Sequence, residues 1–400
     1  MHLNKIIVSG VLGAALLLSV TGCSPAAPAV SAPQPTPAAT AAPTAEPTPT
    51  PAPTPTVETV RFSATGDDLI HEALYNQAKA RATDGGYDFS AAYENMRDFY
   101  AGFDVNWLNQ ETLVNDVYDP SGYPCFSTPG DITDALYSIG FRVFSLSNNH
   151  SYDKGAGGID ASLSYWNTLP EDVVTTGFYD LGAYDNYAYQ TVNGITIGYL
   201  SYTEHTNGIP TPSDTAYGVV TLDQTEVIAA QMAAVRPNCD VLVISCHWGT
   251  EGSHVVNDFQ RQTAQWLADR GADLIIGTHP HVTQTAEWLT AADGHAAFVA
   301  YSLGNFISAQ SEPDNMIGAI LDISFVKTTQ PDGSIAVALQ DPGLHPTVTQ
   351  YEPHYDNVRV YLYRDYTDEL GAAHGNFTLS RDSIAETLRG SIDESLILWE

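Results

Sequence analysis

The segment Asp273-Leu-Ile-Ile-Gly-Thr-His-Pro-His281 joins an apolar run to two histidines that lie two residues apart. A short apolar run that ends in glycine predicts a buried strand over residues 273–277. Side chains two positions apart in an extended chain lie on the same side of it, so His279 and His281 are able to serve one metal site. A histidine pair beside a proline is more often simple loop polarity, so this spacing alone does not establish a metal site.

Strands and helices alternate on both sides of this segment. Apolar and β-branched runs predict strands at 60–65, 141–146, 195–200 and 240–245, and amphipathic stretches predict helices at 131–139, 223–235 and 258–270. The chain from about Leu344 predicts a further strand at 358–363 and a helix at 383–388. Neither a repeat nor a second linker divides residues 57–400, so we expect one domain with an α/β fold and covered sheets.

The first 56 residues have a different character. Residues 1–22 carry one early lysine and then an apolar run too short for a membrane span, which predicts a secretory signal peptide. The end of this segment, Leu18-Ser-Val-Thr-Gly-Cys23, resembles a bacterial lipobox, in which cleavage leaves a lipid on Cys23. Residues 23–56 are almost entirely Ala, Pro and Thr, which predicts a disordered tether. We therefore expect a protein anchored by lipid to the extracytoplasmic face of the cell membrane.

The net charge limits what this protein is able to bind, and the cysteine content limits its disulfides and thiolate metal sites. The formal net charge is −32 and there are four lysines, which excludes nonspecific binding to nucleic acid and favours a bound cation. Apart from Cys23, the cysteines are Cys125, Cys239 and Cys246, which permit one disulfide at most. Since there is no Cys-x-x-Cys pair, the sequence predicts no zinc-thiolate site.

Polar residues follow four of the predicted strands. These clusters are Gly66-Asp67-Asp68, Ser147-Asn148-Asn149-His150, Cys246-His247-Trp248-Gly249 and the Gly277–His281 segment. In α/β sheets the carboxyl ends of the strands line the ligand-binding edge, so residues distant in sequence converge there. The sequence therefore predicts one site built from all four clusters.

The donor atoms of these clusters suit a transition-metal centre. The candidate ligands comprise a carboxylate, an amide and three imidazoles, a mixture suited to Mn, Fe or Zn: Asp67, Asn149, His247, His279 and His281. Glu111 is the candidate for a carboxylate that bridges two ions. Two such ions polarise a phosphoryl or acyl group and hold hydroxide for attack. His150, beside Asn149, is then free to donate a proton to the leaving group.

Each candidate also has a structural interpretation. Asp67 is able to cap a helix that begins near Leu69, and Glu111 is able to be an exposed glutamate at a helix start. Asp153, Glu251 and Asn305 are either turn residues or residues that orient the ligands and the substrate. The remaining histidines are expected to be surface or structural side chains: His205, His254, His295, His345, His354 and His374.

The ordered set of motifs resembles a known family. GDDLI (66–70), NQET (109–112), SNNHSYDKG (147–155), CHWGTE (246–251), GADLIIGTHPHV (271–282) and YSLGNF (301–306) are similar to the CapA family of poly-γ-glutamate capsule proteins, which is related in fold to calcineurin-like metallophosphoesterases. The resemblance covers about residues 58–310. It implies an αββα sandwich of two mixed sheets flanked by helices. It also implies metal ligands at Asp67, Glu111, Asn149, His247, His279 and His281, and a catalytic His150.

Two departures from the family patterns are visible. The phosphoesterase pattern has a histidine two residues after the first aspartate, whereas this chain has Leu69 there, with His71 two residues farther on. Gln110 occupies a position that is usually apolar in the CapA pattern, which makes Glu111 the least typical of the matched ligands.

The resemblance implies a metal-dependent hydrolase in the synthesis, export or processing of an anionic capsule polymer such as poly-γ-glutamate. Its substrate is then an anionic polymer or a phosphoester, and its partner a membrane synthase complex. Two alternatives stay open: a noncatalytic accessory or scaffold subunit of such a complex, which Leu69 favours, and a secreted metallophosphodiesterase of another substrate. The Asn149-His150 pair favours an enzyme.

Overall fold

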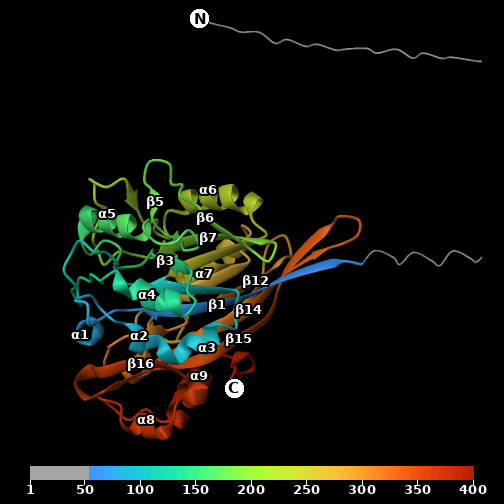
Figure 1. Ribbon diagram of the computed structural model, residues 1–400. Helices are drawn as coiled ribbons and strands as arrows, with labels where there is room; N and C mark the ends of the chain where they lie inside the picture. The colour runs from blue at the N-terminus through green and yellow to red at the C-terminus, as the bar shows by residue number, and fades with distance from the viewer. Residues whose placement is uncertain (1–53) are drawn as a thin grey trace, which may run out of the picture. The chain divides into compact units, whose positions relative to one another are not determined.

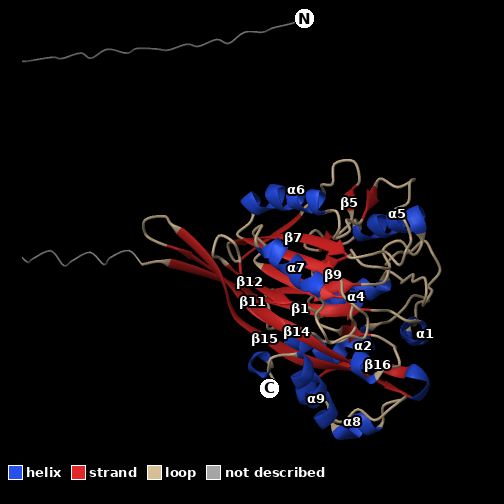
Figure 2. Cartoon of the chain, turned by 180° about the vertical axis from the view of Figure 1, so that it is seen from behind, coloured by secondary structure: helices blue, strands red, loops and turns tan. Residues whose placement is uncertain are grey.

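Two mixed β-sheets pack against each other in the computed structural model, which describes residues 54–400 (Figure 1). The predicted signal peptide at 1–22, Cys23 and most of the predicted tether lie outside the described residues. Helices cover the sheets on their outer sides, so the predicted α/β sandwich is confirmed (Figures 1 and 2).

The first sheet combines a parallel half and an antiparallel half. Its order is β16 (Asp356–Leu362), β15 (Ile335–Glu352), β14 (Ile317–Thr329), β1 (Thr56–Asp68), β2 (Val105–Gln110), β3 (Val143–Ser145) and β4 (Val174–Thr176), and β13 (Asn305–Ile307) pairs with the end of β1. Strands β1 to β4 are parallel, whereas β14, β15 and β16 are antiparallel to their neighbours.

The second sheet has a parallel centre and antiparallel edges. Its order is β11 (Ala286–Thr290), β12 (Ala296–Ala300), β10 (Leu274–Thr278), β9 (Val241–His247), β7 (Ile195–Thr203) and β6 (Ala188–Val192). The short strands β5 (Tyr179–Asp180) and β8 (Tyr217–Gly218) form a separate pair. The strand predicted over 273–277 is β10, at the centre of this sheet.

The apolar side chains of strand β9 pack into two hydrophobic cores, one on each face of the second sheet. In β9, Val243 faces the core between the sheets, whereas Leu242 and Ile244 pack with Met232 and Leu267 in a second core. Those two partners lie on α6 (Thr225–Val235) and α7 (Asp258–Ala268), which cover the outer face of this sheet (Figure 2). A strand buried on both faces needs an uninterrupted apolar sequence, which is why this region was readily predicted.

The other helices contribute mainly to the core around the first sheet. They are α1 (Glu72–Arg81), α2 (Ser90–Tyr93), α3 (Arg97–Tyr100), α4 (Asp131–Ser138), α5 (Gly155–Trp166), α8 (Asp368–Ala372) and α9 (Arg381–Ser391). The alternative that Asp67 caps a helix is wrong, because Asp67 lies in β1 and the helix that follows, α1, begins at Glu72 with His71 at its N-cap. Among residues 54–400, no helix has both the length and the apolar character that a membrane span requires.

The described cysteines are separate. Cys125, Cys239 and Cys246 are free thiols, and Cys246 is buried in the second core. The sequence permits one disulfide at most among these cysteines, and none forms among the described residues.

Gly66 allows β1 to approach the chain at Gly304. A Cβ atom at Gly66 would lie 1.8 Å from the Gly304 carbonyl oxygen, which accepts a 3.0 Å hydrogen bond from the Asp67 N–H. We expect Gly66→Ala to lower the free energy of unfolding by about 3 kcal/mol, because backbone must move to relieve the clash. Gly390 in α9 has no such neighbour, so Gly390→Ala is the matched control. Equal unfolding free energies for the two variants in urea titrations would contradict this account.

Candidate metal centre

The six predicted ligands meet at the carboxyl ends of the parallel strands of both sheets. Asp67 lies near the end of β1, Glu111 follows β2, Asn149 follows β3, His247 ends β9, and His279 and His281 follow β10. All six are at most 4% exposed. The structure thus brings together residues that are separated by as many as 214 positions, from Asp67 to His281.

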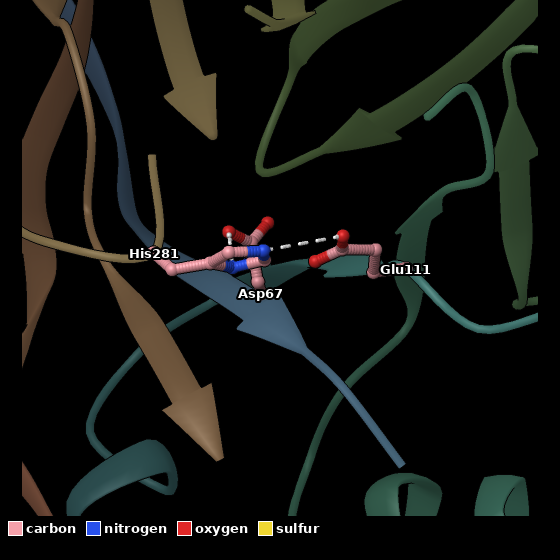
Figure 3. A group of neighbouring side chains, drawn as sticks. All are labelled: Asp67, Glu111 and His281. Carbon is pink, nitrogen blue, oxygen red and sulfur yellow. Dashed lines mark ion pairs between the residues drawn. The ribbon is translucent and has the colours of Figure 1, made fainter. Parts of the chain in front are cut away.

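The first ligand group consists of Asp67, Glu111 and His281, whose candidate ligand atoms all lie within 4.8 Å of one another (Figure 3). His281 Nδ1 lies 3.3 Å from Asp67 Oδ2, and His281 Nε2 lies 3.8 Å from Glu111 Oε1. Asn305 Oδ1 lies 2.9 Å from His281 Nδ1 and accepts its proton in a hydrogen bond. This contact orients the ring so that Nε2 faces Glu111, as expected for a metal-binding imidazole.

The second ligand group consists of Asn149, His247 and His279. His247 Nε2 lies 2.9 Å from Asn149 Oδ1 and 3.1 Å from His279 Nδ1. Thr278 Oγ1 lies 2.9 Å from the other ring nitrogen of His247 and holds the ring in place. Two imidazole nitrogens and an amide oxygen therefore point to one small volume, where a single cation is able to take all three.

The two histidines of the opening segment belong to different groups. They lie beyond the strand, because β10 ends at Thr278, and the φ angles of His279 and His281 are 95° and 58°. Left-handed backbone is strained for residues with a side chain, and such strain is concentrated at functional sites. Around Pro280, this backbone places one imidazole in each ligand group.

Glu111 lies between the two groups. Its Oε1 is 3.6 Å from His247 Nε2 and 3.8 Å from His281 Nε2. Both carboxylate oxygens are buried and lack a hydrogen-bond partner among residues 54–400, an arrangement that is costly unless a cation binds there. The alternative of an exposed glutamate at a helix start is wrong, because Glu111 is 1% exposed. The donor set and the unpartnered carboxylate both fit divalent metal ions.

Burial and the nearby carboxylates shift the pKa values of the candidate ligands. Burial raises the pKa of Glu111 well above its usual value. Burial also lowers the pKa of His281, but Glu111 and Asp67 outweigh it and raise that pKa to about 10. Burial lowers the pKa of His247 well below its usual value and that of His279 to about 3, so these imidazoles are neutral. Without a cation, the Glu111–His281 pair therefore holds at least one proton at neutral pH.

This proton makes metal affinity depend on pH. The raised pKa of His281 means that the proton is present below about pH 10, and a metal ion must displace it to reach the imidazole. We expect the affinity for Mn²⁺ to fall about tenfold for each unit by which the pH decreases from 8 to 6. Calorimetric titrations at several pH values measure this slope. An affinity that is constant over the range would contradict the coupling.

His150 and Asp153 form a hydrogen-bonded pair beside the second ligand group. Asp153 Oδ2 lies 2.8 Å from His150 Nδ1 and also accepts a 2.6 Å hydrogen bond from the Phe126 N–H. The Phe126 ring packs perpendicular to the imidazole, with centroids 4.7 Å apart. With Nδ1 held by the carboxylate, Nε2 of His150 is the nitrogen that is available to move a proton.

The other predicted site residues differ in their contacts. Asn305 touches His281 and Asp153 touches His150, as described above. Glu251 is exposed and, within residues 54–400, makes neither a hydrogen bond nor an ion pair with the six candidate ligands. Its charge nevertheless contributes to the raised pKa values of Glu111 and His281, so it acts on the site through its electrostatic field.

His71 is not among the side chains whose candidate ligand atoms converge in the first group, although burial and the neighbouring His281 and His150 lower its pKa to about 4. Leu69 is buried, and His71 Nδ1 accepts a 3.2 Å hydrogen bond from the Ala309 N–H. The His71 ring packs edge-on against Phe126, with centroids 5.4 Å apart. The first ligand group, as described, therefore contains three side chains and not four.

Two buried residues at the site were missed from the sequence. Asn109 Nδ2 donates a 2.7 Å hydrogen bond to Asp67 Oδ1, which orients that carboxylate. Asp68 accepts a 2.5 Å hydrogen bond from the Tyr93 hydroxyl, and burial raises its pKa to about 7. Both residues lie at the carboxyl ends of strands and next to, or two residues from, predicted ligands, and that position was the available signal.

Comparisons with known proteins identify a family for most of the described chain. Residues 61–310 match a family model described as the bacterial capsule synthesis protein PGA_cap. The chain is 29% identical over 249 residues to the PGA biosynthesis protein CapA of Bacillus subtilis (strain 168), covering 62% of this chain and 63% of that protein. It is 26% identical over 260 residues to the capsule biosynthesis protein CapA of Bacillus anthracis, covering 63% of this chain and 61% of that protein. The chain thus matches less than two thirds of either relative.

Solved structures with a similar arrangement include two nucleotidases. The NAD nucleotidase of Haemophilus influenzae aligns with a TM-score of 0.43 at 14% identity, covering 84% of this chain and 57% of that chain. A putative 5′-nucleotidase from Staphylococcus aureus aligns with a TM-score of 0.44 at 14% identity, covering 72% of this chain and 54% of that chain.

Proposed function

The chain belongs to the bacterial capsule synthesis protein family PGA_cap, and from this premise we propose that it acts in the synthesis, export or processing of an anionic capsule polymer, such as poly-γ-glutamate, through a metal-dependent hydrolase-type site. Glu111 carries the catalytic part of the proposal. Its two buried carboxylate oxygens lack a hydrogen-bond partner in the described part of the chain, and Oε1 faces a histidine of each ligand group. Burial of an unpartnered carboxylate costs free energy, so it is not expected in a protein that serves only as a scaffold and binds no metal.

The residues divide into roles around this carboxylate. Asp67, Glu111 and His281 would hold one ion, and Glu111 would share the second with Asn149, His247 and His279; nitrogen and oxygen donors of this kind suit Mn, Fe or Zn. When bound, such ions polarise a phosphoryl or acyl group and supply a metal-activated water.

Asp153 holds the His150 ring by Nδ1, which leaves Nε2 to give a proton to the leaving group. The scissile bond in this proposal is a phosphoester or an amide-like bond, and both leave an oxygen or nitrogen atom that needs a proton.

Metal content and hydrolysis test the proposal together. The full chain is loaded with Mn²⁺, freed of excess ions, and measured for bound metal and for hydrolysis of bis(p-nitrophenyl) phosphate. We expect two ions per chain and activity that is lost with a chelator and restored by Mn²⁺. A folded protein that binds no metal and hydrolyses nothing would refute the hydrolase site.

A noncatalytic accessory subunit of a membrane polymer-synthesis complex is the second candidate, and a specific observation favours it. Buried Leu69 occupies the position at which the phosphoesterase pattern has a histidine, and His71 is not in the group of converging ligand atoms formed by Asp67, Glu111 and His281. A first ligand group of three side chains binds an ion less tightly than one of four. One ion per chain, held by the second group, together with no hydrolysis would favour this candidate.

We also propose that the protein is held at the extracytoplasmic face of the membrane by a lipid on Cys23, on the basis of the lipobox-like sequence before it. Cys23→Ala is expected to move the protein from the membrane fraction to the soluble fraction, because a thioether-linked lipid can no longer form. Cys125→Ala is the control, since Cys125 is an exposed thiol far along the sequence. Fractionation of cells that express each variant checks this, and an unchanged distribution of Cys23→Ala would contradict it.

A further inference from the structure

The loop that follows β7, residues 204–209, is attached to the second ligand group; we call it the entry loop. The Glu204 N–H donates a 2.8 Å hydrogen bond to the carbonyl oxygen of His247. The Glu204 side chain accepts another of 2.8 Å from the Gly249 N–H. Two hydrogen bonds to the end of β9 thus hold the start of this loop against a candidate ligand.

Asn207 in the entry loop determines how the Asn149 amide is turned. Asn207 Oδ1 accepts a 3.3 Å hydrogen bond from Asn149 Nδ2. This contact directs Asn149 Oδ1 toward His247 Nε2, 2.9 Å away, where it is able to bind a cation. The reverse orientation would present an NH₂ group, which cannot bind a metal ion.

His205 touches the site from its solvent side. The sequence predicts a surface or structural side chain, and His205 is exposed, yet its ring packs perpendicular to that of His279 with centroids 5.0 Å apart. Its Nδ1 accepts a 3.3 Å hydrogen bond from the Asn207 N–H. In the neutral imidazole the proton is therefore on Nε2, which is free to donate a hydrogen bond.

Among the described residues, the ion-pair partners of the carboxylate ligands are histidines. Within residues 54–400, neither lysine nor arginine forms an ion pair with any of the six candidate ligands; the ion pairs of Asp67 and Glu111 are with His247 and His281. An anionic substrate that approaches a site lined with carboxylates needs a donor of this kind beside the metal ions.

We propose that the entry loop forms the substrate side of the site, with His205 Nε2 donating a hydrogen bond to an anionic oxygen of the substrate and Asn207 positioning Asn149. The oxygen belongs to a phosphoryl group or to a carboxylate, which offer the same acceptor chemistry. This inference rests on the proposed function, because it assumes that the site binds metal and takes an anionic substrate.

Anion binding tests the role of His205. The full chain with bound Mn²⁺ is titrated calorimetrically with inorganic phosphate and, in a second arm, with glutarate. His205→Ala is expected to weaken the binding of the preferred anion about tenfold, the loss expected for one hydrogen bond to a charged group, with unchanged Mn²⁺ content. His205→Gln, which retains an N–H donor, is expected to restore part of the affinity. Equal anion affinity in the wild-type protein and His205→Ala would overturn the proposal.

Metal affinity tests the role of Asn207 separately. Its φ angle is 52°, so Asn207→Gly retains the left-handed backbone and removes the acceptor, whereas Asn207→Asp retains an acceptor oxygen. We expect Asn207→Gly to lower Mn²⁺ affinity about tenfold and Asn207→Asp to leave it near the wild-type value. Equal affinity in Asn207→Gly and the wild type would overturn the positioning role. A wild-type chain that binds no Mn²⁺ would instead overturn the proposed function itself.

Discussion

Replacing Glu111 by glutamine is expected to abolish divalent-metal binding and, with it, the stabilisation that metal gives to the fold. Glu111 Oε1 faces the Nε2 atoms of a histidine from each ligand group, at 3.6 Å from His247 and 3.8 Å from His281, whereas Asp67 lies on the Nδ1 side of both rings. Glutamine has the same shape but no charge, so neither group retains a bridging anion. An ion that binds only the folded state raises the free energy of unfolding by about 4 kcal/mol at a concentration 1,000 times its dissociation constant.

Unfolding with and without metal measures this effect. We expect Mn²⁺ to raise the urea midpoint of the wild-type protein and to leave that of Glu111→Gln unchanged. Glu386→Gln is the matched control, because Glu386 is exposed on α9 and contacts none of the candidate ligands among the described residues. It should respond to Mn²⁺ as the wild type does. A full metal response in Glu111→Gln would show that this carboxylate does not bridge the two groups.

Replacing His150 by alanine is expected to lower turnover about 10²- to 10⁴-fold, the range typical of a lost general acid, with no change in bound metal. The reason is geometric, since Asp153 occupies Nδ1 at 2.8 Å and leaves only Nε2 to transfer a proton. The loss should be greater for a phosphodiester with an alkyl leaving group than for one with p-nitrophenolate, because the weaker leaving group depends more on the proton.

Two further variants distinguish a loss of proton transfer by His150 from a general disturbance of the fold. Asp153→Asn is expected to lower turnover about 10- to 100-fold. The His150 ring would lose the charged partner that orients it but would still have Nε2 for proton transfer. His295→Ala is the control, since His295 pairs with Asp293 on the surface and takes no part in the site. Equal losses for good and poor leaving groups in His150→Ala would argue against proton donation.

Element positions were predicted well where a strand is apolar on both faces. The predicted strand at 240–245 is β9, Val241–His247, and the predicted helix at 258–270 is α7, Asp258–Ala268, with an Asn257 capping box at its start. Buried parallel strands require continuous apolar runs, and helix caps require particular side chains, so both leave local signals in the sequence.

Strand β2 was missed because its sequence, Val105-Asn-Trp-Leu-Asn-Gln110, carries three polar side chains although all six residues are buried. Asn106 accepts a hydrogen bond from Ser63, and Asn109 donates one to Asp67. These partners lie 43 and 42 positions away. Polar side chains in a strand are satisfied there only through neighbours that the local sequence does not show.

The long antiparallel strands β14 and β15 were also missed. The first half of β15 is largely exposed, and it lies opposite the end of β14 in a hairpin. An exposed hairpin has no buried face, so its sequence need not alternate apolar and polar residues. Its strands are held by pairing with each other, and the local sequence does not show that pairing.

The sequence by itself determined the family, the α/β class and the candidate ligands, because apolar strands and the polar residues at their ends are local features of the chain. The proline between His279 and His281 already suggested that each imidazole faces a different ion, but only the tertiary structure decided which ligands each one joins, that Glu111 lies between the groups without a hydrogen-bond partner among the described residues, and that His205 reaches the site. Those facts depend on left-handed backbone after β10 and on contacts between the two sheets. Such contacts form only when the sandwich closes, and no local pattern of residues encodes them.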